Sequence, residues 1–449
     1  MSTLIKGLYI VKHWFGDVIF RRVFKNAGFL MSGKVANGLL GLIYFGLAAH
    51  GLGVKQFGIL ILVQTYIQVI TGITTFQSWQ AVIRYGVICL EKKDVLSLQK
   101  LIKFTSLLDV VGVAFGAIIA YICAPLIAPY VGWSEEVVAY VRPYSFLILF
   151  TIVATPTGIL RLNDRFDLLA IQAVVPSMVR VIGVVLAYFL DAPFWAYLLA
   201  WFVAGMVSGL TLLVMGWLEA LRQGWLYTLT FSLSNLTAPH RGIVKFAIAS
   251  NLHSSLLIVP SHMSTFLIGI VATPTAAGLF KVAREMATAL TKPAELLTQS
   301  IYPEFARLGG RNSWQDFARL IIRSTTVAGS LGLIVLVVII VLGKTFLSLA
   351  FGPEFVSAYW ALVLLVAAAT LTIAAFGLDP AMYAMGRPSI PLTVNTIVIL
   401  AVYLPLLTVL TPRMGPAGAG VAMLISSLLI VTSMSLMTVV VLSRRAKRQ

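Results

Sequence analysis

Charged side chains are scarce in this chain. Asp, Glu, Lys and Arg together make up only 11% of the 449 residues, whereas 59% of the residues are hydrophobic. An average soluble protein devotes about a quarter of its residues to charge. The mean hydropathy of +0.95 agrees with this imbalance. A large aqueous domain is therefore excluded, and the composition is typical of a polytopic membrane protein, in which lipid replaces water around most of the surface.

Cysteine and acidic residues are also rare. The two cysteines, Cys89 and Cys123, fall in or beside apolar segments, so a framework of disulfides is not expected. The 33 Lys and Arg residues exceed the 16 Asp and Glu residues, which gives a net charge of +17. This excess has two ordinary sources, nucleic-acid binding and membrane topology, and the distribution of the basic residues decides between them.

Catalytic motifs are absent as well. Gly343-Lys344-Thr345 is similar to the end of a phosphate-binding loop, but Val338 stands where that loop requires glycine. No zinc-protease helix and no Gly-x-Ser-x-Gly elbow occurs in the sequence. We therefore expect neither ATP hydrolysis nor another enzymatic activity, and we expect no metal and no cofactor.

What the chain does contain is a series of long apolar windows. A helix needs roughly 20 residues to cross about 30 Å of hydrocarbon. The sequence predicts an all-α polytopic protein with about twelve such crossings. They are expected near 27–51, 57–82, 104–129, 137–161, 168–190, 193–217, 243–272, 275–303, 320–349, 357–385, 389–411 and 416–443.

The basic residues indicate the orientation of these crossings. With both termini in the cytoplasm, most Lys and Arg outside the membrane lie on the cytoplasmic side, and the periplasmic joints hold only Lys55, Lys344 and Arg413. The net charge is therefore a topological signal, and no nucleic-acid partner is expected. Residues 1–25 alternate apolar and basic side chains and predict an amphipathic helix on the cytoplasmic surface. Residues 444–449 form a basic cytoplasmic tail.

The chain divides into two related halves. A polar joint at 218–242 separates an N-terminal six-helix lobe, 26–217, from a C-terminal six-helix lobe, 243–443. Gly58 matches Gly278, and Gly132 matches Gly352, at a common offset of about 220 residues. An even number of crossings gives both halves the same orientation. Parallel repeats of this kind occur in transporters, with the substrate bound where the halves meet.

A polar stripe marks one helix of the second half. Its members are spaced by three or four residues and therefore share one helix face: Lys281, Glu285, Thr288, Lys292, Glu295 and Gln299. The first half has a matching polar face: Gln64, Gln68, Thr71, Thr75 and Ser78. Charge inside a membrane is costly and usually marks a pathway. The two faces predict a cavity between the lobes, and hence a transporter.

Basic residues within the crossings are the expected substrate ligands. They suit an anionic head group, because Arg binds phosphate oxygens through a planar fork and Lys through a mobile point charge. We predict substrate binding by Arg180, Arg284, Lys281, Lys292, Lys34, Arg142, Lys245, Gln64 and Gln68. Arg180 and Arg284 lie deepest, although a structural pair with a carboxylate is the alternative for each. Lys34, Arg142 and Lys245 lie nearer the interfaces, where anchoring to lipid head groups is the competing interpretation.

Four carboxylates accompany these cations. In a low dielectric a carboxylate can take up a proton, so Glu295, Asp379, Glu285 and Asp109 are candidates for coupling transport to a cation gradient. Simple ion pairing is the alternative, since Lys281 with Glu285, or Lys292 with Glu295, can neutralise each other along the helix.

Several local patterns together resemble a known family. They are Leu52-Gly53 with Phe57-Gly58, Gly158 to Leu162 followed by Asp164-Arg165-Phe166-Asp167, Phe351-Gly352 with Phe355, Gly386-Arg387-Pro388, and Gly415 to Gly418. In combination the chain resembles the polysaccharide transporter, or O-antigen flippase (Wzx-type), family of the multidrug/oligosaccharidyl-lipid/polysaccharide exporter superfamily. The resemblance runs along nearly all of residues 22–443. Related peptidoglycan-lipid flippases usually carry fourteen crossings, so about twelve favours the polysaccharide branch.

The resemblance implies a function. It implies two six-helix lobes in the bacterial inner membrane, a cationic cavity open to one side at a time, and a polyprenyl-pyrophosphate-linked oligosaccharide as substrate. Expected partners are membrane lipids and the polymerase and glycosyltransferases of the same pathway. A cation-coupled antiporter of small molecules and a membrane polysaccharide polymerase or glycosyltransferase are the alternatives. The basic excess in the crossings argues against the first, and external joints of about ten residues or fewer argue against the second.

Overall fold

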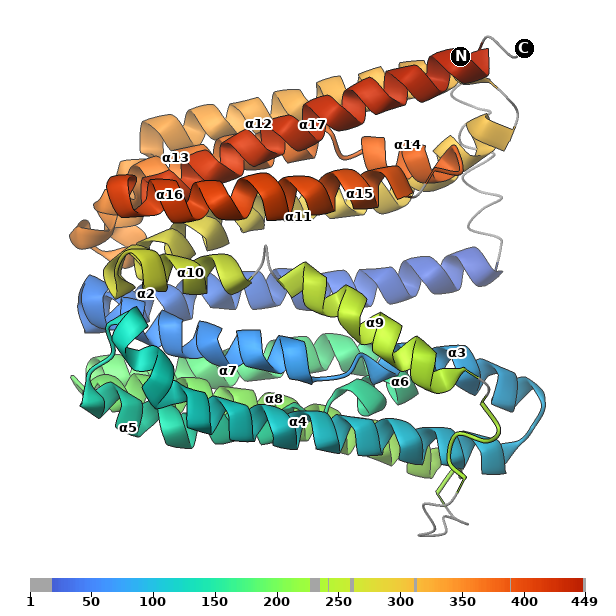
Figure 1. The fold of residues 1–449 in the computed structure, drawn as a ribbon, viewed down its shortest axis with the longest axis horizontal. Coiled ribbons are helices and arrows are strands. Elements are labelled where there is room, and N and C mark those ends of the chain that lie inside the picture. Colours follow the sequence, from blue (N-terminus) through green and yellow to red (C-terminus); the bar gives the residue numbers. More distant parts are fainter. Residues whose placement is uncertain are drawn as a thin grey trace. The chain divides into compact units, whose positions relative to one another are not determined.

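The computed structural model describes residues 18–226, 235–240, 242–258, 262–310, 313–387 and 389–446, and within them every regular element is helical (Figure 1). In this described part, 9 helices are long and apolar enough to cross a membrane. The first of them, Val35–Glu91, covers both of the first two predicted crossings. The predicted all-α polytopic class is therefore confirmed.

The chain forms two compact units. Unit 1 comprises Met1–Gly51, Tyr66–Ile127 and Ser134–Val259, and unit 2 comprises Leu52–Thr65, Ala128–Trp133 and Pro260–Gln449. The lobe boundaries predicted from the sequence, 26–217 and 243–443 around the joint 218–242, stay a prediction.

Unit 1 contains most of the first half of the chain. Its elements are most of α2 (Val18–Thr74), then α3 (Ser78–Glu91), α4 (Val95–Val131), α5 (Glu135–Tyr144), η1 (Ser145–Thr151), α6 (Ala154–Leu162), α7 (Phe166–Phe189), α8 (Phe194–Arg222) and α9 (Ile243–Ile258). α7 packs along α8, and α3 packs against both α6 and α9. A buried apolar cluster that includes Val82, Leu98 and Ile159 holds α3, α4 and α6 together.

Two crossings of unit 1 are interrupted inside the membrane. The second crossing stops at Thr74, where α2 ends, and resumes at Ser78, where α3 begins. The hydroxyl of Thr74 donates to the Ile70 carbonyl at 3.0 Å, a local bond that competes with helix continuation. The fourth crossing carries Pro143, continues as the 3-10 helix η1, and resumes as α6 at Ala154. Both interruptions place helix ends inside segments that the sequence predicts to cross the membrane.

α4 presents two contrasting faces. Val111, Phe115 and Ile122 are more than half exposed and suit contact with lipid tails. The opposite face is lined with small residues, so the backbone of a neighbouring helix can approach α4 closely. A Cβ added at Gly112 would come within 2.5 Å of the Thr74 carbonyl oxygen, so the end of α2 packs directly on α4.

Unit 2 contains most of the second half. Its elements are α10 (Ser264–Val271), α11 (Pro274–Gly310), α12 (Trp314–Phe351), η3 (Pro353–Ala358), α13 (Tyr359–Ala374), α14 (Leu378–Ala384), α15 (Ser389–Val398), the π-helical turn η4 (Ile399–Tyr403), α16 (Leu404–Met414) and α17 (Pro416–Ala446). α13 packs against α11, α12 and α17 (Figure 1). A second buried cluster, around Phe305, Phe317 and Met382, closes one end of this bundle.

Residues 52–65 of α2 belong to unit 2 because of a close helix contact. Gly53 has φ 68° and ψ 169°, a conformation that favours glycine, and it kinks α2. Beyond the kink, a Cβ added at Gly58 would lie 2.1 Å from the Pro274 carbonyl oxygen, and one added at Gly278 would lie 2.8 Å from the Gly58 Cα. The two glycines related by the repeat offset thus pack against each other.

Two of the family-like sequence patterns also meet in unit 2. The Val54 N–H donates to Oε2 of Glu354 at 3.0 Å, and the rings of Phe57 and Phe355 pack edge to face at 5.5 Å between centroids. The patterns at 52–58 and 351–355 therefore describe one packed junction, although some 300 residues separate them in the chain.

The terminal segments are described in part. The predicted amphipathic segment 1–25 lies mostly outside the described residues. In the basic tail, Arg445 donates to the Met385 carbonyl at 2.6 Å and its guanidinium lies over the Trp314 ring at 5.1 Å. Arg445 therefore links the end of α17 to the end of α14 by a hydrogen bond.

Candidate functional site

Unit 2 encloses a cavity of about 490 Å³. Its wall is mostly apolar, but six helical elements contribute polar groups: Arg284 and Thr288 from α11, Thr372 from α13, Asp379 from α14, Asn395 from α15, Tyr403 from η4, and Ser426 and Ser427 from α17. An apolar cavity with a few convergent polar groups is the usual form of a small-molecule site. Both Arg284 and Asp379, which the sequence singled out separately, line it.

Arg284 supplies the positive charge of the cavity. It lies on α11 within electrostatic range of Tyr403 and of Glu285. One turn earlier, Nζ of Lys281 forms an ion pair with Oε1 of Glu285 at 2.8 Å, as the spacing of these two residues predicted. Of these two cations, Arg284 lines the cavity and Lys281 does not.

Asp379 supplies the negative charge. It lies in the first turn of α14, directly before Pro380, where the chain restarts after the end of α13 at Ala374. A carboxylate in the first turn interacts favourably with the positive end of the helix. The interruption between α13 and α14 thus places a half-buried acid on the cavity wall.

Arg180 lies in a different environment, in unit 1. Its guanidinium carbon is 4.9 Å from the ring centroid of Tyr44 and 5.2 Å from that of Trp201, and these two rings pack edge to face at 5.5 Å. One turn away on α7, the Ser177 hydroxyl donates to Oδ1 of Asn37. Arg180 is therefore held by aromatic faces, and no carboxylate pairs with it in the part of the chain that the structure describes.

The remaining predicted ligands are dispersed. Gln64 and Gln68 are half-buried on α2, Arg142 is exposed with its guanidinium over the Tyr121 ring at 5.5 Å, and Lys245 is exposed on α9. None of these four residues lines the cavity of unit 2. The side chains of Lys34, Lys292 and Glu295 lie outside the described part of the structure, so their predicted roles stay predictions.

Among the predicted carboxylates whose side chains the structure describes, Asp109 is the most deeply buried. It lies on the small-residue face of α4 with 1% of its surface exposed, and Oδ2 accepts a hydrogen bond from the Thr155 N–H at 2.7 Å. The residue belongs to unit 1, so it is separate from the cavity that contains Arg284 and Asp379.

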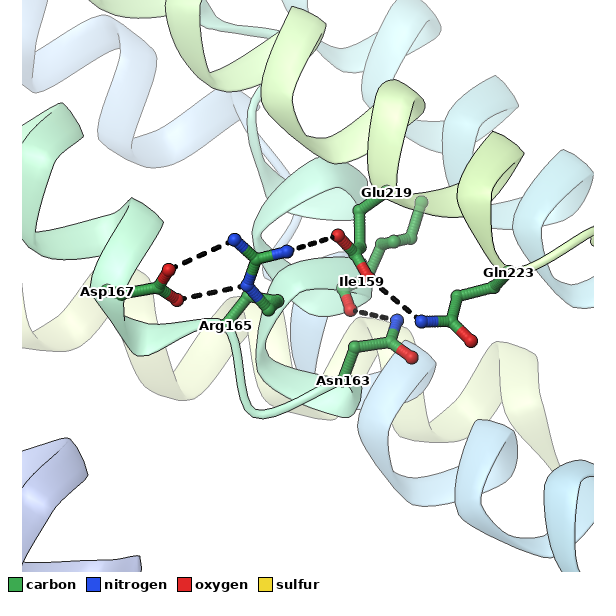
Figure 2. A network of polar contacts seen from close by, with 6 residues as sticks. All are labelled: Ile159, Asn163, Arg165, Asp167, Glu219 and Gln223. Carbon is green, nitrogen blue, oxygen red and sulfur yellow. Dashed lines mark hydrogen bonds and ion pairs between the residues drawn. The ribbon is translucent and has the colours of Figure 1, made fainter.

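Figure 2 shows a polar network that the sequence revealed only in part. Arg165 binds both oxygens of Asp167, at 3.1 and 3.0 Å, and also Oε2 of Glu219 at 2.7 Å. The Gln223 side chain donates to the other oxygen of Glu219 at 2.9 Å. These bonds, first that to Asp167, raise the pKa of Arg165 above its ordinary value. The pattern at 164–167 signalled Arg165 and Asp167, whereas Glu219, on α8, has no local signal that points to them.

These features define the class of the protein. It is a multi-pass α-helical membrane protein with a mostly apolar cavity, lined by a few polar groups, inside one helical bundle. The chain belongs to the polysaccharide biosynthesis protein family, whose model matches residues 23–309.

Individual relatives agree with this assignment. The inner membrane protein YghQ of Escherichia coli (strain K12) is 33% identical over 351 residues, which cover 78% of this chain and 98% of that protein. The fold is similar to that of the lipid II flippase MurJ in an inward closed conformation, with a TM-score of 0.66 and 14% identity over 91% of this chain and 87% of that chain. It is also similar to an inward-facing multidrug resistance MATE transporter of the MOP superfamily, with a TM-score of 0.63 and 16% identity over 93% of this chain and 96% of that chain. At these identities the two structures show the fold alone.

Proposed function

We propose that this protein is a flippase that moves a polyprenyl-pyrophosphate-linked oligosaccharide across the bacterial inner membrane by alternating access. The substrate would be a repeat unit of an O-antigen or exopolysaccharide. Membership of the polysaccharide biosynthesis family supports the pathway, and the likeness to a flippase and to drug exporters supports transport over synthesis. The similarity to an inner membrane protein supports the location.

The single observation that carries the proposal is the chemistry of the cavity in unit 2. A sugar phosphate needs a cation for its phosphate oxygens and hydroxyl or amide groups for its sugar hydroxyls. Arg284 supplies the first, and Asn395, Thr288, Ser426 and Ser427 supply the second. The volume of about 490 Å³ suits part of a head group, while the lipid chain stays in the bilayer.

Arg180 provides a second phosphate ligand in this proposal. Its guanidinium carbon lies near the ring centroids of Tyr44 and Trp201, and a guanidinium presents a planar fork of N–H groups that matches phosphate oxygens. We propose that one arginine in each unit holds the pyrophosphate at different stages of transport, with both termini of the protein in the cytoplasm. The polymerase and glycosyltransferases of the pathway are the proposed partners.

The experiment measures where the lipid-linked repeat unit accumulates. In the native host, Arg284→Gln should reduce surface polysaccharide and leave complete repeat units on the cytoplasmic leaflet, provided that the variant is present at the wild-type level. Arg413→Gln is the matched control, because that arginine is exposed and lies outside the cavity. Normal surface polysaccharide in the Arg284→Gln strain contradicts the proposal.

A cation-coupled antiporter is the second proposed function, and Asp379 favours it. The same cavity contains this carboxylate, which can attract a cationic solute or a coupling ion. The two functions differ in what the Asp379→Asn variant loses. A flippase loses polysaccharide export, whereas a drug antiporter loses resistance to cationic compounds while surface polysaccharide stays intact.

A further inference from the structure

The cavity of unit 2 contains two opposite charges that are not paired with each other. Arg284 and Asp379 both line it. Tyr403 and Glu285 are the ionisable groups that act on the Arg284 guanidinium, and Asp379 is not among them. Within the part of the chain that the structure describes, no ion pair joins Asp379 to a cation. The two charges are therefore separate features of one cavity wall.

The two charges also have different neighbours. Arg284 lies near Tyr403, in the π-helical turn η4. Asp379 directly follows Leu378, which belongs to a buried cluster against which Val394 packs. Val394 precedes Tyr403 by about two and a half helical turns, roughly 13 Å along the axis. The positive and the negative group therefore lie toward different ends of the cavity.

The carboxylate of Asp379 is available to a ligand. It is half-buried, and it lines the cavity together with the apolar side chains of Phe376, Leu378 and Ile430. No hydrogen-bond donor or cation among the described residues acts on it. Opposite charges attract each other more strongly in such surroundings than in water, because less solvent screens them. This position therefore favours a positively charged group of a bound molecule over a neutral hydroxyl.

The other polar groups of the cavity suit the rest of a sugar phosphate. Arg284 binds phosphate oxygens, and Asn395, Ser426 and Ser427 exchange hydrogen bonds with sugar hydroxyls. The volume of about 490 Å³ suits only part of a lipid-linked head group, so the sugar next to the pyrophosphate is the one that reaches the carboxylate. In a sugar, the group that carries a positive charge at neutral pH is a free amine.

We propose that the transported head group is zwitterionic, with a phosphate that Arg284 binds and a free amino group, on the sugar next to the pyrophosphate, that Asp379 binds. This inference rests on the proposed flippase function and adds the class of its substrate. Asp379 is then the residue that selects an amino sugar over a neutral one. The cation that meets this carboxylate belongs to the substrate itself.

The test is isothermal titration calorimetry of the purified full-length protein in detergent with three matched probes. Each probe is farnesyl pyrophosphate linked to one sugar: glucose, or glucose in which an amino group replaces the hydroxyl at the second or at the fourth ring carbon. At least one amino probe is expected to bind the wild type about tenfold more tightly than the glucose probe, because the probes differ only in this group. Equal binding of all three probes to the wild type overturns the proposal.

Variants of the carboxylate locate the preference. Asp379→Asn should bind the amino and glucose probes alike, whereas Asp379→Glu, which keeps the charge, should retain a preference for the amine. Asp316→Asn is the matched control, because Asp316 is an exposed acid of unit 2 that lies outside the cavity, and it should bind as the wild type does. A preference for the amine that persists in Asp379→Asn overturns the assignment.

The Arg284→Gln variant separates this inference from the function on which it rests. It should weaken the binding of all three probes to a similar extent, because each probe carries the same pyrophosphate. If it does so while the wild type shows no preference for an amine, the phosphate site stands and only the selection by Asp379 is wrong. If Arg284→Gln binds every probe as the wild type does, the proposed flippase site itself is wrong, and the inference fails with it.

Discussion

Arg165 and Glu219 lie 54 positions apart, and their side chains meet at 2.7 Å in an ion pair that joins the start of α7 to the end of α8. The carboxylate side is nearly enclosed, since the Glu219 side chain is 4% exposed, and Arg165 also binds Asp167 (Figure 2). Removing the arginine therefore leaves a buried charge without its partner. We expect Arg165→Ala to destabilise the protein by about 3 kcal/mol, measured as a lower thermal unfolding temperature in detergent.

The control for this pair is an exposed one in the same protein. Arg319 and Asp316 form an ion pair at 2.9 Å with side chains 61% and 57% exposed, so Arg319→Ala should cost less than about 1 kcal/mol. Combining Arg165→Ala with Glu219→Gln should recover part of the lost stability, because the orphaned charge is then gone. Equal unfolding temperatures for Arg165→Ala and Arg319→Ala would show that the network does not stabilise unit 1.

Gly58 packs closely against Gly278 and Pro274, so we expect that a side chain at position 58 is not tolerated, whereas one at Gly41 is. A Cβ at Gly58 would approach the Pro274 carbonyl to 2.1 Å, whereas one at Gly41, on the same helix, would approach Tyr44 only to 3.8 Å. Gly58→Val should therefore abolish the folded species, and Gly41→Ala should leave it unchanged. The yield of monodisperse protein in size-exclusion chromatography measures this, and a normal yield of Gly58→Val would show that α2 and α11 do not pack so closely.

Asp94 predicts a pH-dependent contribution to stability. Its Oδ1 accepts the Ser97 N–H at 3.0 Å at the start of α4, and hydrogen bonds from the Ser97 hydroxyl and N–H hold the pKa of Asp94 below its ordinary value of 3.8. Because the pKa of Asp94 is lower in the folded state, its carboxylate contributes its full stabilisation of the fold above pH 3.8. This stabilisation is lost as the pH falls through the folded-state pKa.

The Asp94→Ala variant tests this contribution, because Asp94 caps the N-terminus of α4 through its bond to the Ser97 N–H. At neutral pH the variant should lose about 1 kcal/mol, the usual cost of an N-cap, and the difference from wild type should shrink below pH 3.8. Asp94→Asn, which caps without a charge, should show no such pH dependence. Unfolding temperatures across the acidic range measure the difference, and a constant gap between wild type and Asp94→Ala at all pH values contradicts the assignment.

Arg180 and its aromatic neighbours predict a difference between arginine and lysine. Arg180→Lys keeps the charge but loses the planar group that fits against Tyr44 and Trp201 and binds phosphate with two N–H groups. We expect polysaccharide export to fall about tenfold while the unfolding temperature stays near that of the wild type. Arg413→Lys, at an exposed position, should change neither quantity.

The sequence predicts the crossings well, because apolar length is a local signal. The window 104–129 corresponds to α4, and 168–190 corresponds to α7. The step from Lys281 to Glu285 predicted their ion pair, and both Arg284 and Asp379 were recognised from charge within an apolar segment.

Long-range relationships were not accessible in the same way. Nothing local to Glu219 points to Arg165, and nothing local to Ser78 or Thr155 indicates that both hydroxyls lie beside Asp109. The interruptions at Thr74 and after Thr151 were also missed, because the windows 57–82 and 137–161 are each long and apolar enough overall to predict one continuous crossing.

Transport by the purified protein tests the central claim most directly. The protein is reconstituted in liposomes that contain a polyprenyl-pyrophosphate-linked oligosaccharide, and the fraction of substrate accessible to an external glycosidase is followed over time. Wild-type protein should carry protected substrate to the outer leaflet, and Arg284→Gln should slow this at least about tenfold, as expected when a charged ligand to phosphate is lost. An Arg284→Gln variant that translocates the substrate at the wild-type rate would contradict the account.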